Sequence, residues 1–449
     1  MQKEDNEIME ETRLDWLELI CFITEPSRMD LQKIERWSRI CSSVTVALPD
    51  SSEFYRLPQE VNRMEYSSEM HRSLIWNRLL RTSGKEWVLF LMDDEDPDLD
   101  TLPEEKQLHR KKWAPALIRC DQEDHRGKQF YQIRLVSKTD AAVFDGAMLP
   151  DATRYITSRT ITLTDEPLVI QRTSELFSDV KEEEEMAVRN ISPSLYLVLG
   201  YRLLAERKIA YAAAHFRKLL KMDKLLPFDR LAAVNGLMSC FAEQYKWDQA
   251  LHLANQAIEA ETGQYLPYLI RYKIFQLNKQ WNEAIDVLLH YQEQISGKGY
   301  SKSSFDKYIS KEETLALLGE LAMKTGLRKE ALGFYETLYH LTQKKAVKEL
   351  QHILLVLSIE LLDYEKAVFF FKQIFEGYLP DKLTLEMAAK LHDYLSMFMV
   401  NGWYDYPSEV YDMLYAHESD NGEYRRRLIV TLTKTNRLER AQKLIVKNL

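Results

Sequence analysis

The stretch GKEWVLFLMDDEDPD, from Gly84 to Asp98, decides how the N-terminal part of the chain folds. A short apolar run, Trp87 to Met92, is followed at once by five acidic side chains within six residues. A short apolar run that ends at turn residues is typical of a buried strand. Carboxylates at the end of such a strand either hold a metal ion or form a solvated acidic loop. The sequence leaves both alternatives open.

The segments around this strand alternate between strand-like and helix-like patterns. LDWLELICFIT and SSVTVALPD have the composition of strands, and DLQKIERWSRIC between them places Ile34, Trp37 and Ile40 on one helical face. SSEMHRSLIWNRLLRTSG predicts a second helix, and FYQIRLVS and AVFDGAML predict two later strands. This order predicts an α/β domain with a mainly parallel sheet. Ligands of such sheets bind beyond the carboxyl ends of the strands, where the acidic cluster lies.

Composition changes along the chain, and the changes predict domain boundaries. A polar tail occupies residues 1–14, the α/β domain residues 15–178, and a charged linker that contains four consecutive glutamates residues 179–193. From residue 194 to residue 449 amphipathic helices follow one another with short polar turns. We therefore expect an all-helical C-terminal domain.

The second helices of several pairs in this region open alike, with a large residue three positions before an alanine. The segments are KWDQALHLA, QWNEAIDVL, LRKEALGFY, DYEKAVFFF and RLERAQKLI. Trp247 and Trp281 are 34 residues apart, and the later alanine intervals are 47 and 36 residues. A period of about 34 residues is that of tetratricopeptide (TPR) repeats, so residues 194–449 resemble a TPR protein. The resemblance implies a solenoid that binds a protein or peptide. A non-repeating bundle, or a brace for the first domain, is the alternative.

The segment WNRLLRTSGKEWVLFLMDDE resembles the central motif of family-two glycosyltransferases. Asn77, Gly84, Trp87, Asp94 and Glu95 match that motif. The resemblance implies a GT-A fold, a nucleotide-sugar donor, and Mn²⁺ or Mg²⁺ on the donor diphosphate. A GT-A domain followed by TPR helices is similar to the architecture of bacterial family members that modify peptides and proteins.

The resemblance also assigns site residues, in three groups. The metal ligands are Asp93, Asp94 and Asp96. The donor-binding residues are Glu25, Asp50 and Ser51. The catalytic candidates are Asp145 and Asp151, carboxylates near the family's catalytic positions, either of which would act as general base in an inverting transfer.

Several polar positions of the family are lost in this chain. The first motif aspartate falls at Met92, and the aspartate that contacts the nucleobase falls at Leu48. The later histidine and glutamate fall at Leu149 and Pro150.

We interpret the chain as a degenerate glycosyltransferase-like protein, catalytically impaired or inactive, that acts by binding proteins in a glycosylation-related assembly. An active metal-dependent glycosyltransferase with a protein or peptide acceptor is one alternative. A TPR scaffold with an unrelated α/β domain is another.

Composition limits the classes of partner and the cellular location that we expect for the protein. The net charge of −9 without a basic block disfavours a nucleic-acid binder. The four cysteines form no CxxC pair, which favours a reducing, cytoplasmic location. The acidic N-terminus does not resemble a signal peptide, and no apolar run is long enough to span a membrane.

Overall fold

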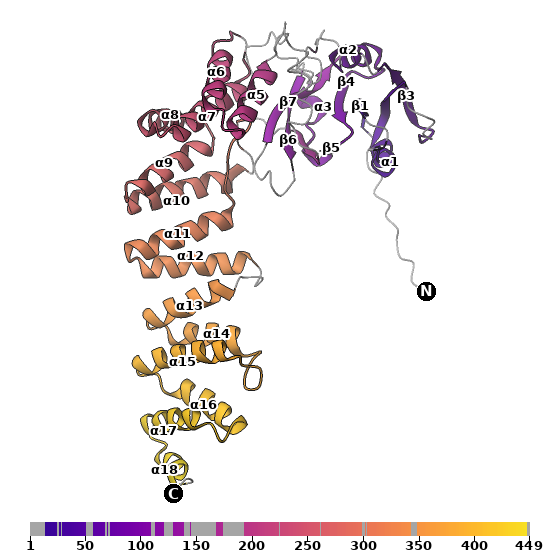
Figure 1. Ribbon diagram of the computed structural model, residues 1–449. Helices are drawn as coiled ribbons and strands as arrows, with labels where there is room; N and C mark the ends of the chain where they lie inside the picture. The colour runs from indigo at the N-terminus through magenta and orange to yellow at the C-terminus, as the bar shows by residue number, and fades with distance from the viewer. Residues whose placement is uncertain are drawn as a thin grey trace, which may run out of the picture. The chain divides into compact units, whose positions relative to one another are not determined.

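Figure 1 shows the computed structural model of the protein. The chain forms two compact units. Unit 1 contains residues 1–274 and 293–308, and unit 2 contains residues 275–292 and 309–449. The structure describes residues 14–446 except 25–26, 28, 51–56, 68–69, 71, 109–112, 121–128, 139–143, 145–167, 174–192, 224, 261, 299–300, 302 and 343–347. This division follows packing and not the change from strands to helices, because unit 1 holds the sheet and also the first helices.

The described part of unit 1 contains an eight-stranded sheet in the order β3-β2-β1-β4-β7-β6-β8-β5. Strands β3, β2, β1 and β4 are parallel neighbours, and β6 is parallel to β8. The pairs β4–β7, β6–β7 and β5–β8 are antiparallel. The sheet is therefore mixed, and the prediction of a mainly parallel sheet holds only for its first half. The strands are β1 Leu14–Phe22, β2 Cys41–Pro49, β3 Val61–Tyr66, β4 Trp87–Met92, β5 Glu95–Asp98, β6 Trp113–Cys120, β7 Gln129–Ser137 and β8 Leu168–Arg172.

Both faces of the central strands are buried. Leu89 of β4 belongs to the same core as Trp37 of helix α1 (Leu31–Ile40). Its neighbour Phe90 faces the other way and stacks on Trp76 of helix α2 (Arg72–Thr82), with ring centroids 4.5 Å apart. Alternate residues of a strand point to opposite faces, so a strand buried on both faces is apolar throughout, as the run Trp87–Met92 is.

The sequence-based elements account for four of the eight described strands. The expected strands before residue 93 and the segment FYQIRLVS are confirmed as β1, β2, β4 and β7, and both expected helices are present. Strands β3, β5, β6 and β8 and the short helix α3 (Glu105–Leu108) were not predicted. The segment AVFDGAML lies outside the described residues except for Phe144, which is not in a strand.

The described helices after the sheet form seven successive pairs. In unit 1 lie α5 Pro193–Ala205, α6 Ile209–Leu220, α7 Pro227–Glu243 and α8 Trp247–Glu259, and α9 Leu266–Leu277 ends in unit 2. The remaining helices are α10 Trp281–Lys298, α11 Lys311–Thr325, α12 Arg328–Leu341, α13 Lys348–Glu360, α14 Tyr364–Phe375, α15 Leu385–Val400, α16 Asp405–His417, α17 Gly422–Lys434 and α18 Leu438–Val446. Among the residues placed by the structure, no helix combines the length and apolar character that a membrane crossing requires.

The same turn joins the two helices of every described pair. One residue has a left-handed backbone with φ between 58° and 79°, and the amide of the next residue donates to the carbonyl five positions earlier at 2.8 to 3.0 Å. This is the hydrogen bond of a Schellman motif. The left-handed residues are Arg207, Tyr245, Lys279, Gly326, Leu362, Gly402 and Asn436.

A small residue follows each of these turns at a fixed distance. It stands five residues after the left-handed position, or six in the α15–α16 pair, and is at most 3% exposed. These residues are Ala212, Ala250, Ala284, Ala331, Ala367, Ser408 and Ala441. The alanines that the sequence singled out are thus buried, and the repeated turn makes the region an array of similar helix pairs.

Candidate functional site at the carboxyl ends of strands β1 and β4

The acidic cluster begins in the turn that connects β4 to β5. Oδ2 of Asp93 accepts hydrogen bonds from the backbone amide of Thr24 at 3.0 Å and from its hydroxyl at 2.6 Å. Thr24 lies just beyond the end of β1, the parallel neighbour of β4. Asp93 therefore ties together the carboxyl ends of two central strands.

The next two carboxylates form a buried ion-pair network with two arginines. Asp94 accepts from Nε of Arg172 at 2.8 Å, and Glu95 accepts from Nη2 of Arg134 at 2.8 Å. Nη1 of Arg172 also lies 3.9 Å from Glu95 Oε1. The other oxygen of Glu95 accepts the amide of Met92 at 2.9 Å. Two positive and two negative charges thus balance in a region that excludes water.

Arg134 is deeply buried in this network. Its guanidinium is 5.0 Å from the ring centroid of Trp76, and its Nε donates to Gln132 at 2.9 Å. Burial lowers the pKa of Arg134 from its ordinary value, and the charge of Glu95 opposes that effect. An uncompensated charge at such depth would cost several kcal/mol. Neither Arg134 nor Glu95 could therefore be buried without the other.

Asp96 lies at the surface and has different partners. Nη2 of Arg36 on α1 donates to its Oδ2 at 2.6 Å, and the indole nitrogen of Trp37 donates to Oδ1 at 3.3 Å. The strand β5 that carries Asp96 pairs with β8. The side chain thus links α1 to the edge of the sheet.

The three predicted metal ligands, Asp93, Asp94 and Asp96, are therefore each engaged by a different part of the protein. A hard divalent cation needs several oxygen ligands that converge on one point. Within the described ranges, no three or more histidine, cysteine or acidic side chains are arranged to hold a metal ion. In this arrangement the residues do not fit a shared Mn²⁺ or Mg²⁺, and the metal assignment stays a prediction. The alternative of a solvated acidic loop is wrong for Asp93 and Glu95, which are buried.

The other predicted site residues are only partly covered by the structure. Asp50 follows β2, is exposed, and donates its backbone amide to Tyr66 at 2.8 Å. It shares with Asp93 the edge of the sheet where the parallel strands end. Glu25, Ser51, Asp145 and Asp151 lie outside the described residues.

One matched motif residue, Asn77, proves to have structural contacts. Asn77 of α2 holds the backbone of Phe144 by two hydrogen bonds, of 2.9 Å and 2.8 Å. The ring of Phe144 packs edge-on against Trp76 at 5.2 Å. The ion pairs of Arg134 and Arg172 were not predicted from the sequence. Arg134 within the predicted strand FYQIRLVS was the available signal, because a buried arginine needs an anionic partner.

Two thiols in unit 1 are poor candidates for nucleophiles. Burial raises the pKa of Cys21 well above its ordinary value and that of Cys240 to about 11. Since the thiolate is the reactive form, neither side chain supports covalent chemistry at neutral pH.

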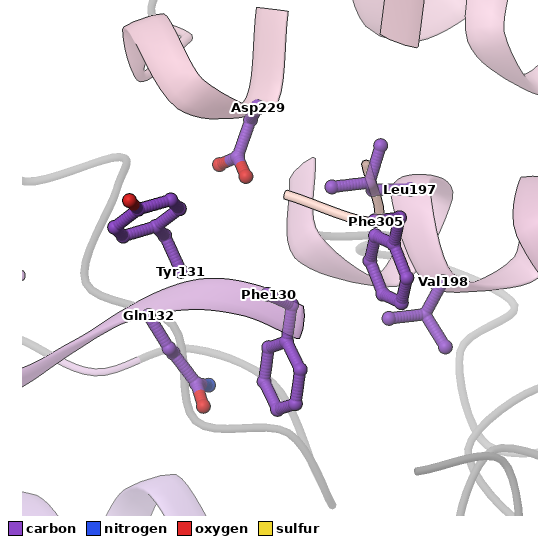
Figure 2. Close-up of a pocket in the computed structure, with 7 residues that line it drawn as sticks. All are labelled: Phe130, Tyr131, Gln132, Leu197, Val198, Asp229 and Phe305. Atoms are coloured by element: carbon purple, nitrogen blue, oxygen red, sulfur yellow. The ribbon is translucent and has the colours of Figure 1, made fainter. Parts of the chain in front are cut away.

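A small pocket opens where helices meet the sheet within unit 1 (Figure 2). Strand β7 contributes one wall, α5 another, and Asp229 of α7 points toward the ring of Tyr131. Its lining is mostly apolar and consists of Phe130, Tyr131, Gln132, Leu197, Val198, Asp229 and Phe305.

Comparisons with known proteins give structural likeness only. No protein-family model and no curated protein matches the sequence. The structure of Naa15/Naa10 bound to HypK-THB is similar over 56% of this chain and 35% of its own, at 13% identity and a TM-score of 0.42. This chain thus spans about a third of that protein.

Two smaller helical proteins are also similar. YrrB, described as a TPR protein with an unusual peptide-binding site, covers 49% of this chain and 98% of its own, at 15% identity and a TM-score of 0.30. The pilF protein of Pseudomonas aeruginosa covers 52% of this chain and 95% of its own, at 15% identity and a TM-score of 0.30.

Proposed function

We propose that the chain is an adaptor whose helix pairs bind a protein or peptide partner. The observation that carries this proposal is the seven-fold recurrence of one turn and one buried small residue from α5 to α18. Repeated helix pairs present extended surfaces that typically bind proteins or peptides. The adaptor would serve a glycosylation-related assembly through its glycosyltransferase-like sheet.

The contacts of the acidic cluster support an impaired sheet domain. A nucleotide-sugar donor leaves as a diphosphate, and a divalent cation normally neutralises its charge. Here Arg172 and Arg36 already neutralise Asp94 and Asp96, and Met92 occupies the position of the first motif aspartate. A cation would have to displace arginines from their carboxylates before it could bind.

Exposed apolar side chains offer a test of the binding surface. Tyr211 on α6, Phe369 on α14 and Val430 on α17 are 68%, 45% and 51% exposed. A partner captured with the full chain and then purified should bind more weakly to variants with serine at one or more of these positions. Leu74→Ser on α2 is the matched control, since Leu74 is 54% exposed on the sheet domain. Loss of binding with Leu74→Ser alone would place the partner on the sheet domain and overturn the proposal.

An active metal-dependent glycosyltransferase is the second candidate function. The observation that favours it is the position of Asp50 and Asp93 at the ends of parallel strands, beside the place where the strand order reverses around β1. Such places are the usual ligand sites of α/β sheets. Titration calorimetry with UDP, GDP and their sugars, with and without Mn²⁺, tests it. Metal-dependent micromolar binding that Asp50→Ala removes would support transfer, and no binding at millimolar ligand would contradict it.

A further inference from the structure

The interval between the turns at Lys279 and Gly326 is longer than the other intervals of the array. The helices α10 and α11 are separated by residues 299–310, whereas residues 293–308 belong to the same compact unit as the sheet. We call Ser301 and the residues from Ser303 to Asp306 the latch. The regular turn at Lys279 is complete without it, so the repeat itself does not require the latch.

An aromatic side chain anchors the latch. The ring of Phe305 stacks on Tyr201 of α5 at 4.6 Å and on Phe130 of β7 at 5.9 Å. The side chain is only 8% exposed and borders the pocket of Figure 2. Its backbone has a φ of 52°, a left-handed conformation that is unfavourable for a bulky residue.

Hydrogen bonds to strand β7 and helix α7 extend this anchorage. The amide of Tyr131 donates to the hydroxyl of Ser304 at 2.9 Å, and the phenol of Tyr131 donates to the carbonyl of Ser301 at 2.6 Å. The amide of Ser304 donates to the carbonyl of Phe228 at 3.4 Å. The latch therefore bridges the sheet and α7.

A carboxylate holds the end of the latch. Asp306 accepts the amide of Tyr265 at 2.6 Å and that of Leu266, the first residue of α9, at 2.9 Å. The hydroxyl of Ser301 and the side-chain amide of Asn235 also donate to it. In the same region Oδ1 of Asn235 and Oε1 of Gln264 are buried without a hydrogen-bond partner. A buried carbonyl oxygen without a donor is destabilising, so the latch fits this surface imperfectly.

We propose that the latch is an internal ligand, and that the surface it covers on β7, α5, α7 and the start of α9 is a docking site for a partner segment in which serines precede Phe-Asp. A ring in an aromatic slot, main-chain hydrogen bonds and a carboxylate at a helix N-terminus are how proteins hold peptide segments. The left-handed Phe305 and the two unpaired amide oxygens favour release. A partner that adds donors for Asn235 and Gln264 gains contacts the latch lacks. This inference rests on the proposed function only in that the occupant is a protein segment.

A peptide of the chain itself tests the docking site without a partner. The probe is a fluorescent peptide of residues 299–308, titrated into the full-length Phe305→Ala chain and into the unmodified chain. We expect the variant to bind the peptide about tenfold more tightly or better, because its own latch no longer competes. The control chain is Tyr308→Ala, since Tyr308 is 41% exposed beside the latch, and the control peptide carries alanine in place of phenylalanine. Equal affinities for a folded variant and the unmodified chain would overturn the proposal.

Hydrogen exchange of the unmodified chain decides the matter if the variant does not fold. The amides of Tyr265 and Leu266 should exchange faster than the helical amides of Met238 and Cys240 in α7, because latch opening precedes global unfolding. Equal exchange rates would show that the latch opens only when unit 1 unfolds, which would overturn the proposal. Neither measurement involves the array partner, so failure here leaves the proposed adaptor function intact.

Discussion

Arg134 of strand β7 and Glu95 of strand β5 form an ion pair of 2.8 Å in which neither side chain is more than 3% exposed. The two strands are not neighbours, since β6 and β8 lie between them in the sheet. The pair therefore joins the end of β4, where Glu95 also accepts the amide of Met92, to the second half of the sheet. The cluster that looked like a metal site in the sequence thus acts as a structural joint.

Replacing Glu95 by glutamine should strongly destabilise unit 1. The substitution keeps the size of the side chain but leaves the charge of Arg134 buried without its main counter-ion. Breaking a buried pair in this way costs about 3 to 5 kcal/mol. Urea denaturation followed by tryptophan fluorescence measures the change, since Trp76 lies 5.0 Å from Arg134.

The exposed pair of the same cluster provides the matched control. Arg36 and Asp96 are 55% and 36% exposed, and such pairs contribute about 1 kcal/mol or less. Asp96→Asn should therefore leave the denaturation midpoint nearly unchanged. If Glu95→Gln and Asp96→Asn cost the same, the interpretation of the buried pair as the structural joint is wrong.

Removing a glycine at one turn and introducing one at an equivalent turn should change stability in opposite directions. Gly326 and Leu362 both have left-handed backbones, with φ of 78° and 59°, and Leu362 is 65% exposed. A left-handed backbone costs a non-glycine residue about 1 to 2 kcal/mol. Gly326→Ala should therefore destabilise unit 2 by about 1 kcal/mol, whereas Leu362→Gly should be neutral or stabilising. Thermal unfolding measures both, and a stabilising Gly326→Ala would contradict the shared turn.

These turns show why the repeat was only partly visible in the sequence. The buried alanines such as Ala250 and Ala284 were detectable, because a small residue at each close approach leaves a fixed signal. The turns were not, because five of the seven described left-handed positions carry a residue other than glycine, Tyr245 among them. The Schellman hydrogen bond, and not residue preference, holds these positions.

The acidic cluster shows a second limit of prediction from sequence. The segment EDPD has low strand propensity, yet it forms β5 because it pairs with β8, more than 70 residues later. The arginines that neutralise Asp94 and Glu95 are likewise distant, at positions 172 and 134. A local pattern identified the strand end correctly, but only the assembled sheet shows which charges meet there.

A methyl group at Gly319 should disrupt the packing of α11 on α12. A Cβ at this position would lie 2.5 Å from Cζ of Tyr335, whose ring is 6% exposed. Overpacking of this kind costs about 1 to 3 kcal/mol. Gly319→Ala should lower the melting temperature, and Tyr335→Leu in the same chain should recover part of the loss.

A glycine in the facing helix supplies the control for this substitution. Gly333 of α12 is exposed, and a Cβ there would meet nothing within 4 Å. Gly333→Ala should stabilise the helix by up to about 1 kcal/mol, since alanine favours helices over glycine. If both alanine variants were equally stable, the close approach of Gly319 to Tyr335 would not constrain the packing.

The carboxylate of Asp306 should make the stability of unit 1 depend on pH. Burial raises its pKa from 3.8 to about 6, although Ser301 and the amides of Tyr265 and Leu266 favour the charged form. Between these two values the folded chain holds a proton that the unfolded chain has lost. The contribution of Asp306 to stability therefore falls as pH rises through this window and is constant above about 6.

Asp306→Asn cannot titrate, so the difference in unfolding free energy between the two chains isolates this group from the other carboxylates. Urea titrations of both chains between pH 4 and 7 should show the unmodified chain losing stability relative to the variant by roughly 3 kcal/mol at most, since one pKa unit corresponds to ~1.4 kcal/mol. A difference that stays constant across this range, or that grows in favour of the unmodified chain as pH rises, would mean that Asp306 is ionised in the folded state throughout.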